Sequence, residues 1–195
     1  EKALLFSQSL LVLELIERFL AMSDKQWKLG RDYFRLDGST KATTRQGWIE
    51  RFNDKRNTRG RLFVISTKAG GMGVNLTAAT RVIIFDAAFN PTYDTQAIAR
   101  AFRFGQTCPV YVYRLVADGT MEEKIFRRQV VKNAMATRVV DKGQEIARCE
   151  STKGDLLDYN PTPEPSEDGT KTKTTVSRTH MATDSNSNSN SNSNS

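Results

Sequence analysis

Short apolar runs alternate along this chain with helical patterns, and that alternation limits the possible fold more than any other feature. Five runs have the length and composition of strands: Ala3 to Phe6, Tyr33 to Leu36, Arg61 to Ile65, Arg81 to Phe85 and Pro109 to Val116. A strand–helix rhythm of this kind predicts an α/β fold, with a mostly parallel sheet covered by helices on both faces.

The intervening segments carry recognisable helix signals. Ser9 is a candidate N-cap for a helix whose apolar stripe comprises Leu10, Leu13, Ile16 and Leu20. A second helix is expected over Lys41 to Phe52, with Trp48 and Phe52 four residues apart and facing the sheet. Asn90 and Pro91 are suited to open a third helix, and Thr120 to Glu123 form a capping box for a last one.

Polar and glycine-rich segments follow the predicted strands, where open parallel sheets bind their ligands. One of them, residues 66–75, has three glycines in four positions, which suits backbone N–H groups turned toward an anion. Another, Asp37 to Thr40, offers two hydroxyls for a phosphate. The simpler alternatives are a flexible loop for the first segment and a helix cap for the second.

A third segment, Gln96 to Gln106, contains Arg100 and Arg103 three residues apart, a spacing that places both on one face of a helix. Arginine grips two phosphate oxygens at once, so this pair is suited to a nucleotide triphosphate. A solvated helix face with two ordinary arginines is the alternative.

These segments occur together in a fixed order, and the order resembles a known family. The quoted stretches are Ala3 to Gln8, Phe34 to Thr40, Ile65 to Leu76, Val82 to Pro91 and Gln96 to Gln106. Over residues 1–140 the chain resembles the second RecA-like lobe of a superfamily-two helicase, specifically a Swi/Snf-type DNA translocase. Within that family it is most similar to the ATRX branch, near the Rad54 group. Phe89, Phe102 and Phe104 depart from the usual family residues, and they remove no phosphate ligand.

The resemblance implies roles for individual residues. Arg103 is expected to be the arginine finger for ATP hydrolysis, and Arg100 either shares that role or anchors the interface between the lobes. The residues expected near the nucleotide are Gly73, Asn75 and Gln96, with Gln96 and Gln106 ordering the two arginines. Those expected to contact the DNA backbone are Gln8, Gly38, Ser39, Thr40, Thr67 and Lys68. For Gln8 the alternative is a side-chain hydrogen bond to the neighbouring loop. The segment that contains Asp86 couples nucleotide state to DNA contacts in the family, but the residue itself is more simply expected to cap a helix or fix a loop. Phe102 and Phe104 alternate with the polar positions and are expected to pack rather than bind ligand.

Missing motifs limit what this lobe does alone. The sequence has no lysine-bearing phosphate loop and no Asp-Glu box for magnesium. ATP and Mg²⁺ are therefore expected to bind mainly to an N-terminal RecA-like lobe of the parent chain, and this fragment alone is not expected to hydrolyse ATP. The competing hypothesis is a non-catalytic DNA- or protein-binding scaffold lobe. An RNA helicase of the same superfamily is disfavoured by Gly105-Gln106 and Asn90-Pro91.

Charge and composition divide the chain in two. Residues 1–150 hold 25 Lys and Arg against 16 Asp and Glu, whereas residues 151–195 hold 4 against 6. A basic folded part suits a polyanion such as duplex DNA. The resemblance implies that this DNA is nucleosomal and that the parent is a remodelling or repair protein of the nucleus. The domain is placed at 1–150, with a bracing helix at about 120–140, and the tail at 151–195 is expected to be disordered.

Several other sites are excluded by composition. The one histidine, His180, lies in the tail, and Cys108 and Cys149 lack metal or redox spacing, so no metal site is expected. No apolar run approaches the ~20 residues that span a bilayer, so no membrane partner is expected.

Overall fold

The structure is a computed structural model that describes residues 1–23, 25–70, 73–140 and 174–181, with side chains up to residue 132. Five strands form a parallel sheet: β1 (Ala3–Ser7), β2 (Tyr33–Leu36), β3 (Leu62–Ser66), β4 (Arg81–Ile84) and β5 (Val110–Ala117). A sixth, β6 (Thr174–Met181), pairs antiparallel with β5, and the order across the sheet is β2-β3-β1-β4-β5-β6. The predicted RecA-like α/β class is confirmed.

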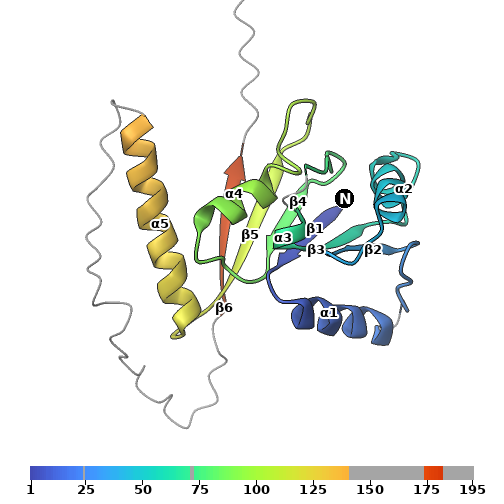
Figure 1. The fold of residues 1–195 in the computed structure, drawn as a ribbon, viewed down its shortest axis with the longest axis horizontal. Helices are drawn as coiled ribbons and strands as arrows, with labels where there is room; N and C mark the ends of the chain where they lie inside the picture. Colours follow the sequence, from blue (N-terminus) through green and yellow to red (C-terminus); the bar gives the residue numbers. More distant parts are fainter. Residues whose placement is uncertain (24, 71–72, 141–173, 182–195) are drawn as a thin grey trace, which may run out of the picture.

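Helices cover the sheet as the alternation predicts (Figure 1). They are α1 (Leu10–Met22), α2 (Ala42–Asn53), α3 (Thr67–Gly70), α4 (Pro91–Ile98) and α5 (Met121–Val140). The predicted caps are present, because Ser9 Oγ accepts from Val12 N–H at 3.4 Å and Asn90 Oδ1 accepts from Thr92 N–H at 3.1 Å. Helices α1 and α4 therefore start where their capping residues predicted.

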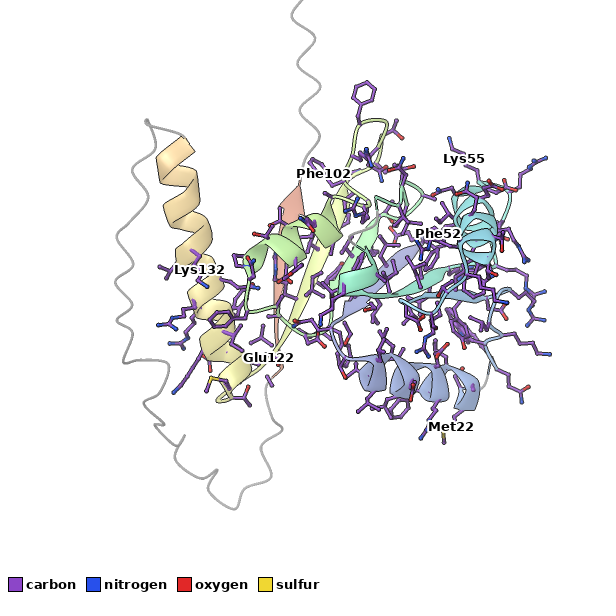
Figure 2. The ribbon with its side chains drawn as sticks, in the orientation of Figure 1. Met22, Phe52, Lys55, Phe102, Glu122 and Lys132 are labelled. Carbon is purple, nitrogen blue, oxygen red and sulfur yellow. The ribbon has the colours of Figure 1, made fainter. Side chains whose placement is uncertain are left out.

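Two apolar clusters, one on each face, hold the layers together. The larger lies under α2 and α4, where Phe52 packs edge-on against Phe34 and Phe63 with ring centroids 6.1 and 5.3 Å apart. Figure 2 shows Phe52 turned toward the sheet, as predicted. The smaller lies under α1 and includes Leu13, with Ile16 and Leu20 at its margin. Leu10, predicted in this stripe, is instead exposed.

Gly60 shows how tightly the larger cluster is packed. A Cβ added at this residue, just before β3, would lie 2.7 Å from Phe34 Cε2 and 2.9 Å from Asn57 Nδ2. Gly47, in the middle of α2, has nothing within 4 Å of the same hypothetical atom. Only the first of these glycines is therefore required by packing.

The structure differs from the sequence expectation at residues 174–181. They lie in the segment predicted to be disordered, yet they pair with β5 along its whole length, from Thr174 opposite Ala117 to Met181 opposite Val110. The segment is rich in threonine and contains Val176, which favours strands, and β5 would otherwise have an open edge. Residues 141–173 and 182–195, which hold the rest of the predicted tail, lie outside the described residues.

Candidate functional site

The two arginines do not lie on a helix. Helix α4 ends at Ile98, and Arg100 and Arg103 belong to a series of tight turns that closes at Gly105, where φ is +95°. The first turns are fixed by backbone hydrogen bonds, among them Arg100 N–H to Ala97 O at 3.2 Å and Phe102 N–H to Ile98 O at 3.0 Å. The helical-face prediction was wrong because α4 has only eight residues.

These turns also lie at the opposite end of the strands from the one predicted. Arg100 O accepts from Leu76 N–H at 3.0 Å, and residues 76–80 lead into the amino end of β4. Thr80 N–H in turn donates to Lys2 O, just before β1 begins. The chain leaves the carboxyl end of β4, and α4 returns it to the amino end of the sheet, as a parallel crossover requires. Arg100 and Arg103 therefore lie in the segment that brings the chain back to the amino end of the sheet.

Arg103 contacts a residue predicted to lie near the nucleotide. Its Nη1 donates to Oδ1 of Asn75, and both side chains are exposed. Gly73, two residues earlier, has φ of +71° and open space where a Cβ would be. The structure thus brings together three of the predicted residues, at a surface that a ligand can reach. Arg100 is half-buried behind them, so neither arginine is shut inside the lobe.

Gln106 fastens the arginine turns to the loop that carries Asn75. Its Nε2 donates to Thr77 O at 2.9 Å, to Ala79 O at 3.0 Å and to Ala101 O at 3.3 Å. Its Oε1 accepts from Cys108 N–H at 3.1 Å. The predicted ordering role therefore has a clear geometry for Gln106. Gln96 lies exposed on α4, two residues before the helix ends.

Asn53, at the end of α2, holds the same loop from the other side. Its Nδ2 donates to Asn75 O at 2.8 Å, and its Oδ1 accepts from Ala78 N–H at 3.3 Å. No local pattern predicts this contact, because the two partners are 22 and 25 residues away along the chain. Asn53 and Gln106 together fix the backbone from Asn75 to Ala79.

The two phenylalanines around Arg103 behave differently from each other. Phe102 is partly buried and packs against the larger core cluster, as predicted. Phe104 is fully exposed, with no packing partner in the described part of the lobe, so its prediction as a packing residue was wrong. The reversal of the chain at Gly105 turns this ring away from the core.

The predicted DNA-contacting residues lie at the carboxyl ends of three adjacent strands. Ser39 and Thr40 follow β2, Thr67 and Lys68 follow β3, and Gln8 follows β1. With about 4.8 Å between neighbouring strands, the three positions span roughly 10 Å. Lys68 is exposed, whereas Thr67 keeps only 8% of its surface accessible. Lys68 is thus more accessible to a ligand than Thr67.

Asp86 organises this edge next to β1. Its Oδ2 accepts from Ser7 Oγ at 2.5 Å and its Oδ1 accepts from Gln8 N–H at 2.8 Å. Gln8 Nε2 donates to Ala87 O at 3.2 Å, so its side chain bonds the neighbouring loop. The loop-fixing role predicted for Asp86 is confirmed.

Asp37 organises the turn after β2. Its Oδ1 accepts from Ser39 N–H at 2.9 Å and from Ser39 Oγ at 2.6 Å, and its Oδ2 accepts from Arg35 Nε at 2.9 Å. Burial alone would raise the pKa of Asp37, but the Ser39 and Arg35 contacts together hold it below its usual value. The Ser39 hydroxyl is therefore hydrogen-bonded within the turn. Gly38 and Ser39 are the exposed residues of this turn.

A buried polar contact joins α4 to α5 and was not predicted. Gln129 Nε2 donates to Asp94 Oδ2 at 2.9 Å and also to Ala88 O, and Asp94 Oδ1 accepts from Ala88 N–H at 3.4 Å. Both side chains are 3% exposed. Burial raises the pKa of Asp94, and the hydrogen bond from Gln129 offsets this only in part. The helix predicted as a brace is thus anchored to the lobe's own α4.

The described residues contain no group of three or more His, Cys, Asp and Glu side chains that could hold a metal ion. None of their helices combines the length and apolar character needed to cross a membrane.

Comparison with known proteins places this geometry in a family. Residues 1–105 match the helicase conserved C-terminal domain. The chain is 50% identical over 182 residues to the transcriptional regulator ATRX of Mus musculus, a match that covers 81% of this chain and 7% of that protein. It is 48% identical over 175 residues to protein CHROMATIN REMODELING 20 of Arabidopsis thaliana, covering 86% and 12%. It is also 48% identical over 153 residues to helicase ARIP4 of Homo sapiens, covering 72% and 10%.

A solved structure agrees with these sequence matches. The C-terminal part of the Fun30 ATPase domain superposes with a TM-score of 0.58 at 42% identity, covering 65% of this chain and 38% of that one. The chain thus spans about a tenth of the length of its sequence relatives. It belongs to the helicase conserved C-terminal domain family, as the second RecA-like lobe of a Swi/Snf-type superfamily-two protein of the ATRX branch.

Proposed function

We propose that this lobe is the C-terminal half of an ATP-dependent duplex-DNA translocase that remodels chromatin. The names of its relatives, a transcriptional regulator, a chromatin-remodelling protein and a helicase, support this function. The observation that carries the proposal is the contact between Arg103 and Asn75 on an exposed surface, held from behind by Gln106. A guanidinium presented in this way is available to a ligand that comes from outside the lobe.

That ligand is the triphosphate of ATP, held mainly by the N-terminal RecA-like lobe of the parent chain, with its Mg²⁺. Phosphoryl transfer places negative charge on the equatorial oxygens of the γ-phosphate, and a positioned guanidinium stabilises that charge. Arg103 is the finger in this proposal, and half-buried Arg100 supports it from the same turns. Asn75 orients Arg103 by accepting from Nη1, while Gly73 lets the backbone approach the nucleotide. Gln96 completes the nucleotide-binding set.

The carboxyl ends of β2, β3 and β1 hold the DNA backbone. Gly38, Ser39, Thr40, Thr67, Lys68 and Gln8 are the contacting residues, and the roughly 10 Å that they span matches two to three phosphates along one strand. Contacts to phosphate carry no base information, so movement along DNA is independent of sequence. Affinity falls steeply with salt because each neutralised phosphate releases counterions.

The two edges of the sheet give the lobe its mechanical role. The arginine turns lie at the amino ends of β4 and β5, and the DNA contacts lie at the carboxyl ends of the neighbouring strands. Arg103 gains its γ-phosphate contact only when the two lobes close, and hydrolysis removes that gain, so the lobes open again. A rigid lobe transmits this motion to the DNA it holds. The parent acts in the nucleus, on nucleosomal DNA.

The test uses the two-lobe parent with duplex DNA as stimulant. We expect this chain alone to show no ATP turnover and the two-lobe protein to show DNA-stimulated turnover. Arg103→Ala should abolish the stimulated rate at saturating DNA, whereas Lys68→Ala should raise the DNA concentration needed for half-maximal rate. Stimulated turnover of Arg103→Ala within a few-fold of wild type would refute the finger. A two-lobe wild-type protein without any turnover would instead indicate a scaffold.

A further inference from the structure

A basic pocket lies at the amino ends of β2 and β3, away from the predicted DNA contacts. It encloses about 410 Å³ and is lined by Lys25, Trp27, Arg31, Asp32, Thr58, Arg59 and Arg61. Asp32 and Arg61 immediately precede the two strands, and Arg61 N–H donates to Asp32 O at 3.0 Å. Because the strands are four and five residues long, roughly 13–17 Å of sheet separates this pocket from the carboxyl edge.

A carboxylate holds two of the arginines in place. Asp32 Oδ2 lies 2.8 Å from Arg31 Nη2, and Asp32 Oδ1 lies 3.4 Å from Arg59 Nε. Lys28 N–H donates to the same carboxylate at 3.0 Å. Arg61 is fixed separately, through a 3.1 Å hydrogen bond from its Nε to Thr58 O. One carboxylate against four cations leaves the pocket strongly positive, with its arginines already oriented for anions.

The positive charge extends beyond the pocket. Residues 24–32 and 51–61 together hold eight Lys and Arg against three Asp, a net +5, while the whole chain carries +7. Lys55 and Arg56, in the loop from α2 to β3, are exposed, and Figure 2 shows Lys55 reaching outward. Charge spread along two loops fits an extended polyanion better than a single phosphate group.

The surroundings of Trp27 bear on which kind of polyanion the pocket binds. Its ring is partly buried and packs against the apolar cluster under α1, and the same residue also lines the pocket. The remaining contacts come from guanidinium and ammonium groups, which bind phosphates in any sequence. Single-strand binding relies on several aromatic side chains on which successive bases stack, whereas Trp27 is the one aromatic residue among the described residues that line this pocket, so a duplex fits better.

We propose that this basic pocket binds the phosphate backbone of a second duplex DNA segment, distinct from the segment at the carboxyl edge. The inference rests on the proposed function only in taking DNA as the parent's substrate, since the pocket makes no use of ATP. A lobe that holds DNA at both ends of its sheet bridges two duplexes, or two turns of one bent duplex.

The experiment measures binding of the 195-residue chain to a fluorescent 20-base-pair duplex by anisotropy, from about 0.05 to 0.3 M salt. The pocket variant is Arg59→Gln with Arg61→Gln, and Lys25→Gln with Lys28→Gln is the second variant. The control is Arg127→Gln with Arg128→Gln on α5, which removes the same charge. Circular dichroism checks that each variant is folded.

Each double substitution in the pocket should weaken DNA binding at 0.1 M salt by about tenfold to a hundredfold. It should also lower the steepness of log K against log salt by about two, since each lost phosphate contact removes about 0.9 from that slope. The losses should add to that of Lys68→Ala at the carboxyl edge, whose result tests the proposed function separately. Pocket variants that bind no more weakly than the control would overturn the proposal. So would tighter pocket-dependent binding of polyglutamate of equal charge, which would identify an acidic protein partner, or of a single strand.

Discussion

Gln106 is the residue whose removal should most weaken the site without touching a ligand. Its Nε2 carries two hydrogens that meet three carbonyl oxygens, and its Oε1 accepts one backbone N–H. Counting the amide as about three net hydrogen bonds of about 1 kcal/mol each, Gln106→Ala should lower the free energy of unfolding by about 2–3 kcal/mol. The side chain is half-buried, so water replaces only part of what is lost.

Urea denaturation followed by tryptophan fluorescence measures this effect. With a slope of about 2 kcal/mol per molar urea, the unfolding midpoint should fall by about 1–1.5 M. Gln96→Ala is the matched control, because Gln96 lies exposed on α4 in the same segment and should shift stability by less than about 0.5 kcal/mol. Equal midpoints for the two variants would refute the idea that Gln106 fastens the arginine turns.

Further predictions concern packing, pH and the α5 anchor. Gly60→Ala should destabilise the fold by about 1–3 kcal/mol, while Gly47→Ala should stabilise it by about 0.5–1 kcal/mol, both measured by urea denaturation; equal shifts would contradict the packing account. Asp37→Asn should cost about 1.5–3 kcal/mol at pH 7, measured by thermal unfolding. The pKa of Asp37 is lower in the folded state than its unfolded value of 3.8, so the ionised carboxylate contributes to the free energy of unfolding above that value. This contribution is lost as pH falls through the folded pKa, so the stability difference between wild type and Asp37→Asn should shrink below about pH 4. Gln129→Leu leaves buried Asp94 without its 2.9 Å partner and should cost about 2 kcal/mol, whereas exposed Val130→Ala should change stability by less than half of that.

Local patterns were sufficient to predict most of the fold. Ser9 and Asn90 cap the helices that their positions indicated, and Phe52 reaches the sheet one turn after Trp48, because these outcomes depend on neighbours within a few residues. The strand at 174–181 was missed for the opposite reason. Its formation depends on the free edge of β5, more than fifty residues earlier, which the composition of the tail does not reveal.

In the candidate site too, contacts between residues that are distant in the sequence could not be predicted from local patterns. The contact of Arg103 with Asn75 brings together two residues that the family resemblance had assigned separately, and their 28-residue separation hides it from any local pattern. The placement of the arginines at the carboxyl edge failed because a short helix plus a turn carries the chain back across the sheet, and helix length was not fixed by the sequence. Asn53 and Gln129 were missed because a side-chain amide that bonds a distant segment has no sequence signature of its own.

The most direct measurement for the central claim is the single-turnover rate of ATP cleavage by the two-lobe parent carrying Arg103→Ala, at saturating ATP and duplex DNA. The cleavage rate should fall at least about 10³-fold below wild type, because the guanidinium stabilises the charge that develops on the γ-phosphate, and DNA affinity should stay unchanged, because Arg103 is not among the proposed DNA contacts. A cleavage rate within a few-fold of wild type would show that Arg103 does not stabilise the triphosphate during cleavage, and would refute its role as an arginine finger.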